Sequence, residues 1–222
     1  MHHAPPIAVI DFETTGISPG QGARATEIAA VLVQGGRIVG QFQSLMRSGA
    51  WVPPFIEQLT GISNAMLAAA PPFDAVMHDV MRFTAGCPLV AHNAAFDRAF
   101  WVAEGARAGC VPDEAHQFAC TVRLARRLYP QAPNHRLGTL AAFHHLPDAG
   151  RAHRALADAT VTAHLLVRIQ QDLAQRLGAD DPHTAVDHVL LNELQAQPAA
   201  KLPRWLQRRS RACARSRAPG VR

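Results

Sequence analysis

Long apolar runs are missing from this sequence. Nowhere do about 18 or more apolar residues follow one another, as a membrane-spanning helix requires. The first residues, Met1 to Pro6, also lack the charged region and the long apolar stretch of a secretion signal. These absences argue against a membrane protein and against a secreted one. We therefore predict a soluble, cytoplasmic protein without a membrane partner.

Cysteine is scarce and is not arranged in pairs. The four cysteines, Cys87, Cys110, Cys120 and Cys213, are too far apart for the C-x-x-C spacing of a zinc site. Because nothing indicates secretion, they do not suggest a disulfide framework either. We expect reduced thiols that serve mostly in packing.

Acidic residues are absent from residues 198–222, which contain eight lysines and arginines. The whole chain has a formal charge of +5, yet the other residues hold 14 basic and 17 acidic side chains, a charge of −3. A slightly acidic body suits a cluster of metal-binding carboxylates. The basic segment either contacts phosphates or is a solvated, disordered tail, since blocks of like charge are commonly disordered.

A short apolar island surrounds Trp205 within this basic segment. It is either a docking peptide for a polymerase or repair partner, or a segment folded back on the body. A chain of 222 residues with 48% hydrophobic composition supports one sizeable core. We divide the chain into a main domain over residues 1–178, a helical appendage over 179–197, and a basic, flexible tail over 198–222.

The strand signals come first along the chain. Residues 7–13 form a β-rich run, and residues 26–34 and 37–46 are two more strands separated by Gly35 and Gly36, a pair typical of a tight hairpin. Later strands are predicted over residues 88–92 and 118–121, and helices over residues 73–83, 93–108, 122–128, 137–145, 154–177 and 181–195. Asn93 is placed to cap the second of these helices. This order predicts an α/β domain whose mixed sheet carries helices on its faces.

Two carboxylates end the first strand. Asp11 and Glu13 are two residues apart, so both side chains point to the same face of the sheet, where the chain turns. Adjacent buried acids repel one another and lose hydration unless a cation compensates, and hard oxygen ligands favour Mg²⁺ or Mn²⁺. The pair is therefore a candidate metal site, although two solvated acids at a strand end would look the same in the sequence.

Two further segments contain acids beside a histidine. In residues 90–100, His92 and Asn93 end a strand and Asp97 lies in the opening turns of the helix that follows. An acid there gains from the helix dipole, which explains Asp97 but not His92 and Asn93. His153 precedes Asp158 by five residues at the start of a long helix, so it can lean over the same site.

Together these segments resemble the DEDDh branch of the DEDD exonuclease superfamily, most closely the proofreading epsilon subunit of bacterial DNA polymerase III and its relatives. The resemblance spans about residues 7–170 and rests on motifs in the expected order: Asp11-Phe12-Glu13-Thr14-Thr15-Gly16, then His92-Asn93 with Phe96-Asp97, then His153 with Asp158. It implies a ribonuclease-H-like fold with a mixed five-stranded sheet flanked by helices. It also implies a 3′-to-5′ exonuclease that hydrolyses phosphodiester bonds at the 3′ end of DNA in proofreading or repair.

The same resemblance assigns the catalytic roles. Asp11, Glu13 and Asp158 would hold a first divalent ion, Mg²⁺ or Mn²⁺, while Asp11 would bridge to a second ion that Asp97 supports. Such ions acidify an attacking water and stabilise the leaving 3′ oxygen. His153 is suited to accept the proton of that water, because histidine titrates near neutrality.

Substrate contacts follow from the resemblance as well. The positions it indicates are Thr14, Thr15, Leu59, Thr60, His92 and Asn93. Relatives often have histidine-glycine-isoleucine in the segment beside the terminal nucleotide, and Thr60 replaces that histidine here. The departure bears on contact with the base, whereas catalysis does not need the histidine.

Two alternatives stay open at the level of sequence. One is an RNA-trimming exonuclease of the same superfamily, because no residue distinguishes the two substrates by the 2′-hydroxyl. The other is a noncatalytic nucleic-acid-binding subunit that has kept the fold. The expected residue types at all five catalytic positions argue against the second alternative. The expected partner is a single-stranded 3′ end of DNA or RNA.

Overall fold

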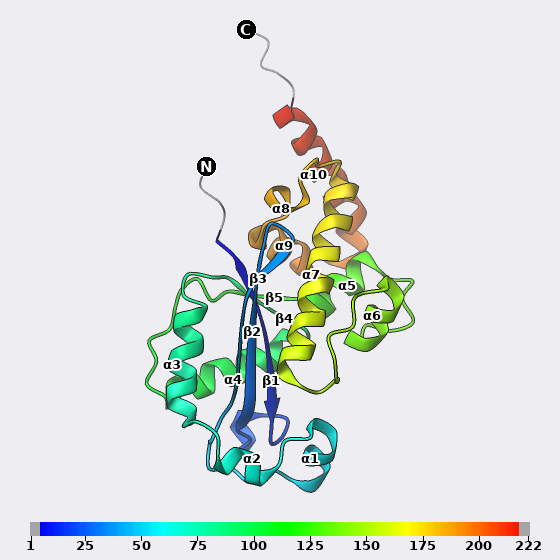
Figure 1. Ribbon diagram of the computed structural model, residues 1–222. Coiled ribbons are helices and arrows are strands. Elements are labelled where there is room, and N and C mark those ends of the chain that lie inside the picture. The colour runs from blue at the N-terminus through cyan, green and yellow to red at the C-terminus, as the bar shows by residue number, and fades with distance from the viewer. Residues whose placement is uncertain (1–4, 218–222) are drawn as a thin grey trace.

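A five-stranded mixed sheet forms the centre of the protein. The computed structural model describes residues 5–217, and Figure 1 shows the arrangement of its helices and strands. The strands are β1 (Ile7–Thr14), β2 (Ala25–Gln34), β3 (Arg37–Leu45), β4 (Leu89–Ala91) and β5 (Phe118–Cys120), in the order β3-β2-β1-β4-β5. The first three strands pair antiparallel, whereas β4 and β5 are parallel to β1. The predicted mixed five-stranded sheet is confirmed.

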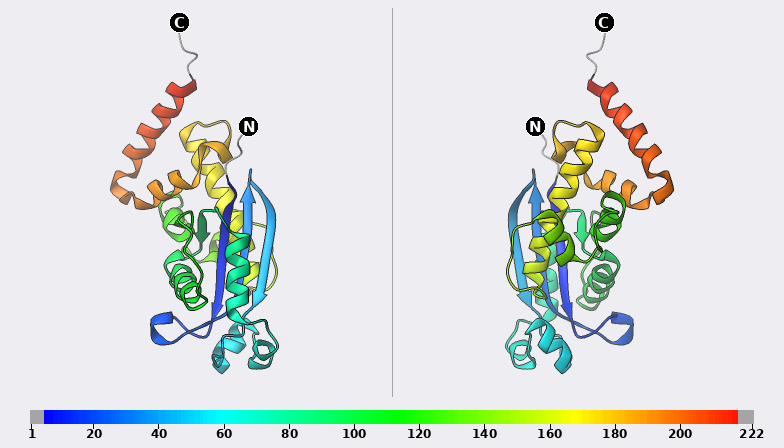
Figure 2. Two further views of the ribbon diagram at one scale, coloured as in Figure 1. Left: turned by 90° about the vertical axis from the view of Figure 1, so that its left-hand side faces the viewer. Right: turned by 90° about the vertical axis from the view of Figure 1, so that its right-hand side faces the viewer.

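The helices cover both faces of this sheet. They are α1 (Pro54–Thr60), α2 (Asn64–Ala68), α3 (Phe73–Phe83), α4 (Ala94–Arg107), α5 (Thr121–Leu128), α6 (Leu137–His144), α7 (Ala155–Leu177), α8 (Pro182–Ala185), α9 (His188–Ala196) and α10 (Leu202–Arg217), with short 3-10 turns η1 (Pro19–Gln21) and η2 (Ala199–Lys201). Helices α3 and α4 pack on one face, while α7 crosses the other face over β1 and β2 (Figures 1 and 2). None of the helices within residues 5–217 is long and apolar enough to cross a membrane.

Strand β1 is buried on both faces because it lies between these two helical layers. Ile7 and Val9 join the core beneath α7, whereas Ala8, Ile10 and Phe12 join the core beneath α3 and α4. The alternation follows the two-residue period of a strand. The odd-numbered positions of β1 therefore face α7.

Small residues allow α7 to lie close to the sheet. Ala155, Ala159 and Ala163 follow one another at intervals of four, share one helix face, and are fully buried. Larger side chains such as Ile169 and Leu173 fill the space farther along the helix. Gly178 ends the helix with a left-handed backbone, φ 68°.

The hairpin between β2 and β3 has the predicted tight turn. Gly35 and Gly36 have φ values of 56° and 74°, as a two-residue turn that matches the strand twist requires.

The single helix predicted over residues 181–195 is in fact two helices, α8 and α9. The chain breaks between them because Asp187 leaves the helix and caps α9, accepting a hydrogen bond from the Leu190 amide at 2.8 Å.

The basic C-terminal segment differs from the flexible tail that its charge predicted. Residues 202–217 form α10, and residues 218–222 lie outside the described part of the chain. Leu202 and Trp205 are buried in the core cluster beneath α7, and Leu206 is half-buried against it. Arg204 and Arg208 of the same helix are exposed. Because the apolar residues fall on one helix face, the segment folds back on the body. The predicted division of the chain at residues 178 and 197 stays a prediction.

We expect Trp205→Ala to lower the free energy of unfolding by about 3 kcal/mol, the lower end of the cost of truncating a buried aromatic side chain. Arg204→Ala, one position away on the exposed face, should change it by less than about 0.5 kcal/mol. Urea denaturation of the two variants measures the difference. Equal midpoints for Trp205→Ala and the parent protein would show that α10 is not part of the folded core.

Candidate active site

The first acids of the site are on β1. Asp11 and Glu13 occupy odd positions of the strand, so both carboxylates lie on the face that α7 covers. Glu13 is buried and Asp11 is half-buried. The predicted shared face of this pair agrees with the structure.

Asp97 is tied directly to the same strand. Strand β4 pairs with β1 only at Ala8 and Val9, so the later amides of that edge have no strand partner there. The Oδ1 atom of Asp97 accepts a hydrogen bond from the Phe12 amide at 3.2 Å, and the Asp97 side chain is buried. Asp97 thus reaches β1 between the two acids that precede and follow Phe12.

Asn93 does not cap α4 as predicted. Asn93 is the residue immediately before the helix. Its φ of 69° lies in the left-handed region, and its side chain forms no capping hydrogen bond. The chain passes from β4 into α4 within two residues, and this reversal requires an unusual backbone that asparagine tolerates better than most residues. Asn93 is exposed, and its backbone rather than its side chain makes the turn into the helix.

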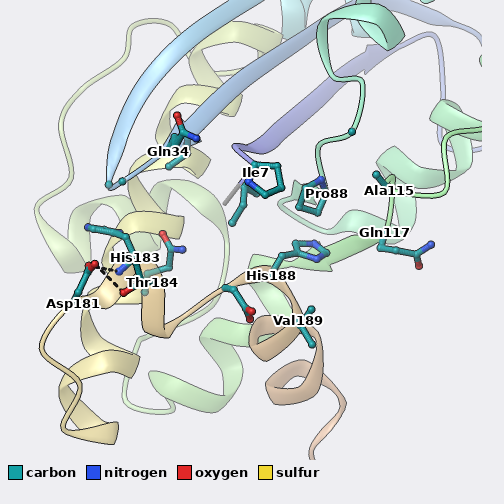
Figure 3. A pocket seen from close by; sticks show the side chains of 17 residues that line it. Ile7, Gln34, Pro88, Ala115, Gln117, Asp181, His183, Thr184, His188 and Val189 are labelled. Carbon is teal, nitrogen blue, oxygen red and sulfur yellow. Dashed lines mark hydrogen bonds between the residues drawn. The ribbon is translucent and has the colours of Figure 1, made fainter. Parts of the chain in front are cut away.

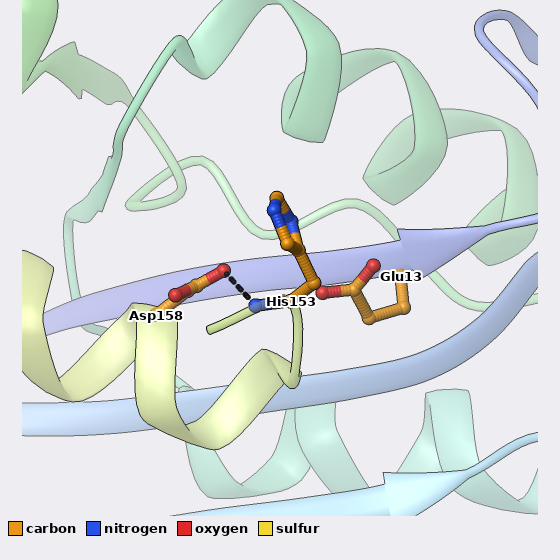
Figure 4. A group of neighbouring side chains, drawn as sticks. All are labelled: Glu13, His153 and Asp158. Carbon is orange, nitrogen blue, oxygen red and sulfur yellow. Dashed lines mark hydrogen bonds between the residues drawn. The ribbon is translucent and has the colours of Figure 1, made fainter. Parts of the chain in front are cut away.

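His153 and Asp158 complete the cluster from the start of α7. The His153 amide donates to Oδ2 of Asp158 at 3.1 Å, and His153 itself has φ 60°. One ligand atom each from Glu13, His153 and Asp158 lie within 4.8 Å of one another. Figure 4 shows the two carboxylates on either side of His153, with the imidazole extending from between them. Residues 140 positions apart therefore meet at one point, as the motif order predicted.

Burial raises the pKa values of all four carboxylates, and the neighbouring acids raise those of Asp11 and Glu13 further. Burial and the neighbouring Asp97, Asp158 and Glu13 raise the pKa of Asp11 well above its ordinary value. Burial, then Asp158, raises the pKa of Glu13 to about 8, and burial raises that of Asp97 to about 7. Burial also raises the pKa of Asp158. Such a cluster is unstable as four charges and fits a hard divalent cation, which would hold every carboxylate in its ionised form.

Glu27 is a further acid that the sequence analysis did not identify. It lies on β2 directly opposite Glu13, is fully buried, and binds the Arg154 guanidinium at 2.7 and 3.1 Å. It also accepts hydrogen bonds from the Ala155 amide at 3.0 Å and from Gln43 at 2.8 Å. Although burial opposes its charge, these bonds hold the pKa of Glu27 below its ordinary value. Glu27 therefore fastens the segment between His153 and α7 to the sheet; its only signal was an acid inside an apolar strand.

Glu104 has a comparable role on the other face of the sheet. This buried residue of α4 binds Arg24 through two nitrogens, at 2.8 and 2.9 Å, and accepts from the Ala25 amide at 3.2 Å. Arg24 in turn donates its amide to Oγ1 of Thr15 at 3.0 Å. Arg24 and Glu104 thus connect the loop that follows β1 to α4.

Four of the predicted substrate-contacting residues lie at the end of β1 and on α1. Thr14 and Thr15 use their hydroxyls within the loop, Thr14 donating to the Gly16 carbonyl at 2.7 Å. Leu59 is exposed on α1. The Thr60 side chain, by contrast, is buried: its hydroxyl donates to the Ile56 carbonyl at 2.9 Å and accepts from the Ile62 amide at 3.1 Å. The expected contact of Thr60 with substrate does not fit this orientation, because a hydroxyl at a helix end bonds readily to its own backbone.

His92 lines a hollow beside the carboxylates. Its Nδ1 atom is 2.9 Å from Oγ1 of Thr121 and its Nε2 atom is 3.1 Å from the carbonyl oxygen of His135. Burial lowers the pKa of His92 to about 4, so the ring is neutral at physiological pH. The hollow, about 790 Å³ in volume, is also lined by Asn93, His153 and Asp158. His92 and Asn93 therefore lie at the site, where the sequence analysis placed them.

A second hollow, of about 640 Å³, lies at the opposite end of β1 (Figure 3). Ile7, Pro88 and Val189 give it a mainly apolar wall, and His188 beside them is bonded to the Leu89 carbonyl at 2.9 Å. None of the residues assigned to catalysis or to substrate contact lines this hollow. The candidate chemistry is therefore confined to the other end of the sheet.

Comparison with known protein families identifies the chain. The family model for exonucleases, RNase_T, matches residues 8–166, a stretch that contains all five of the clustered acid and histidine positions. The chain belongs to this exonuclease family. The resemblance to DEDDh exonucleases that the motifs indicated is thereby confirmed.

Individual proteins of known function are also similar to this chain. The 3′-5′ exonuclease DinG of Bacillus subtilis is 39% identical over 75% of the chain, and the DNA polymerase III subunit epsilon of Aquifex aeolicus is 32% identical over 78% of it. The match covers 84% of the epsilon subunit but only 18% of DinG, and 12% of the PolC-type polymerases that are also similar.

Solved structures show the same fold. Exonuclease X, solved in complex with 5′ overhanging duplex DNA, covers 86% of the chain with 28% identity and a TM-score of 0.62, and 99% of that protein is matched. The nuclease domain of 3′hExo, a DEDDh family member bound to rAMP, covers 76% of the chain with a TM-score of 0.64, with 92% of that domain matched. Its sequence identity of 22% supports the fold alone.

We expect the metal-free protein to lose thermal stability as the pH rises from about 5 to about 8. The pKa of Glu13 is about 8 in the folded state and 4.5 ordinarily, so between these values the folded state binds a proton that the unfolded state has released. Folding is therefore favoured at the lower pH, and the benefit disappears as the pH passes the folded value. Melting temperatures in excess EDTA measure the effect.

Glu13→Gln should flatten this pH dependence, because it removes one titrating group from the cluster. Glu114→Gln, an exposed acid outside the site, is the matched control and should leave the dependence unchanged. If the pH dependence of the melting temperature is identical in Glu13→Gln and in the parent protein, the raised pKa of Glu13 is not its cause.

Proposed function

We propose that this chain is a metal-dependent 3′-to-5′ exonuclease that hydrolyses the terminal phosphodiester bond at the 3′ end of a DNA strand. The observation that carries the proposal is the meeting of four carboxylates and one histidine, from three distant segments, at the end of β1. Among the side chains that the structure describes, no lysine or arginine forms an ion pair with Asp11, Asp97 or Asp158. A site of this kind is built for cations.

The DEDDh exonucleases depend on divalent metal ions, and the donor set here fits them. We assign Asp11, Glu13 and Asp158 to one Mg²⁺ or Mn²⁺ ion and Asp97, together with Asp11, to a second. When bound, the ions neutralise charge on the phosphate and increase the acidity of a water molecule. The carboxylates would then be fully ionised, which removes the conflict that raises their pKa values.

His153 is assigned as the general base. Its side chain is exposed, while its backbone is held by the hydrogen bond to Asp158 and by the Arg154–Glu27 ion pair one residue later. The ring can therefore meet a water molecule next to the carboxylates without loosening the segment that carries it. Accepting the proton of the attacking water is chemistry that imidazole performs well near neutral pH.

DNA is the proposed substrate, in proofreading or repair, because the Aquifex aeolicus relative that matches over most of its length is a DNA polymerase subunit. A polymerase or repair partner would bind the C-terminal segment, where α10 presents Arg204, Arg208 and Arg211 on its exposed face. Rates on matched DNA and RNA oligonucleotides decide between the two substrates. Faster cleavage of RNA would replace this assignment with an RNA-trimming activity on the same site.

Asp158→Asn should reduce the single-turnover rate on a labelled single strand by more than about 10³-fold at saturating Mg²⁺, because a ligand of the ion is removed. Melting without metal should show an unchanged or higher stability, since one repelling charge is absent. Glu114→Gln provides the control for an exposed acid. Wild-type turnover by Asp158→Asn would contradict the metal assignment.

His153→Ala should lower the single-turnover rate by about 10²- to 10⁴-fold, the range for a positioned general base. Added imidazole should restore part of the rate of His153→Ala, because a free base can occupy the vacated position. The same imidazole should not restore Asp158→Asn. A rate within tenfold of the parent, or rescue of both variants alike, would show that His153 is not the base.

A further inference from the structure

The hollow beside the carboxylates extends well past the catalytic cluster. His153 and Asp158 line it at the start of α7, and residues of α5 and of the start of α6 line it as well. Two arginines belong to this second part of the lining: Arg126 on α5, and Arg136 immediately before α6. Apart from Asp158, the lining contains no acidic residue among those that the structure describes. The hollow therefore has cationic side chains in its lining as well as the acid of the catalytic cluster.

Arg126 and Arg136 differ from Arg123 and Arg127 because they do not bind another part of the described chain through their guanidinium groups. Arg123 and Arg127, on the same helix as Arg126, donate to the carbonyl oxygens of Gln195 and Gln197 at 3.0 and 2.8 Å and so hold the C-terminal segment. Within the described part of the chain, the guanidinium groups of Arg126 and Arg136 form no hydrogen bond or ion pair, and both residues are exposed. Helix α5 thus has arginines that serve the fold and one that faces the hollow unpaired.

This arrangement solves a problem that the carboxylate cluster creates. A nucleic-acid strand is a polyanion, and its phosphates beyond the scissile one gain nothing from ions held between the carboxylates. Guanidinium groups match phosphate oxygens in geometry and bind them through paired hydrogen bonds. Val122 on α5, Leu137 on α6 and Val161 on α7 add apolar surface to the same lining, against which a sugar or base can pack.

We infer that the hollow holds the strand that leads away from the scissile bond, with Arg126 and Arg136 binding phosphates on the 5′ side of the cleaved linkage. The inference rests on the proposed exonuclease function and defines how the enzyme holds its polymeric substrate. Because the enzyme cuts at the 3′ end, every other phosphate of the strand lies on that 5′ side. The two arginines are substrate-binding residues and take no part in the bond cleavage.

The first test uses two substrates that differ in what lies beyond the scissile phosphate. Single-stranded oligothymidylate has phosphates on the 5′ side, whereas the p-nitrophenyl ester of thymidine 5′-monophosphate has a single phosphodiester and none beyond it. The double variant Arg126→Ala/Arg136→Ala should raise KM for the oligonucleotide at least about tenfold, the order expected when charge-assisted hydrogen bonds are removed, with kcat retained. KM and kcat for the ester should stay unchanged.

The control removes two charges outside the hollow. In Arg37→Ala/Arg82→Ala, Arg37 begins the exposed strand β3 and Arg82 is paired only with the exposed Asp79. This variant should keep the KM of the parent protein for both substrates. Equal KM values for the oligonucleotide in the two double variants, or a raised KM for the ester in Arg126→Ala/Arg136→Ala, would overturn the inference.

A binding measurement separates this inference from the proposed function. Fluorescence anisotropy of labelled oligothymidylate, with Asp158→Asn as a background that does not cleave, gives the affinity at several salt concentrations with Mg²⁺ present. Removal of both arginines should make the slope of log affinity against log salt shallower by about 0.7 for each phosphate that is no longer bound. A parent protein that never cleaves either substrate would contradict the exonuclease, whereas an unchanged slope would contradict the role of the arginines.

The phosphates themselves are identified by neutral linkages. Oligothymidylates with one methylphosphonate at successive positions should bind the Asp158→Asn protein more weakly when the neutral linkage occupies the hollow. The Arg126→Ala/Arg136→Ala protein in the same background should bind all of them with similar affinity. Equal sensitivity of both proteins at every position would show that the hollow serves another ligand, such as an acidic peptide.

Discussion

Mutual repulsion among four carboxylates is the constraint that the rest of this structure accommodates. The acids are brought together at the end of β1, all of them buried or half-buried, and two of them accept a hydrogen bond from a backbone amide. Asp97 bonds to the Phe12 amide and Asp158 to the His153 amide, and both lie in the first turn of a helix, where the dipole favours negative charge. These contributions reduce the repulsion but leave the pKa values raised, which keeps the site receptive to divalent cations.

Glu27 shows how the scaffold orients this cluster without joining it. Its charge lies directly across from Glu13, which adds to the repulsion, yet it is matched by Arg154 and by the Ala155 amide. The ion pair fixes the start of α7 against β2, so that the residues on either side of it, His153 and Asp158, face β1. Glu27 thus adds to the negative charge near the site, while its bonds to Arg154 and Ala155 define where the histidine segment lies.

The two ends of the sheet differ in their chemistry. The carboxylates and the hollow lined by Arg126 are at the end where β1 leaves the sheet, whereas the mainly apolar hollow around Ile7 is at the opposite end. Arg123 and Arg127 of α5 bind the carbonyl oxygens of Gln195 and Gln197 at the end of α9. Trp205 of α10 is part of the core. Substrate contact and structural closure are therefore assigned to different arginines of a single helix.

The sequence by itself determined the mixed sheet and the positions of the acids, because both depend on local regularities. The two-residue period of a strand places Asp11 and Glu13 on one face, and glycines alone suffice to mark the hairpin. The tertiary structure decided what depends on distant partners. Glu27 and Arg154 are 127 residues apart, and no local pattern indicates that they pair.

Tertiary contacts likewise converted a basic segment with the charge of a disordered tail into helix α10, whose Leu202 and Trp205 pack in the core. In this segment the packing of two apolar side chains outweighed the preference that its charge indicated. Local periodicity assigns a side chain to a face, but only the assembled core determines which partner that face meets.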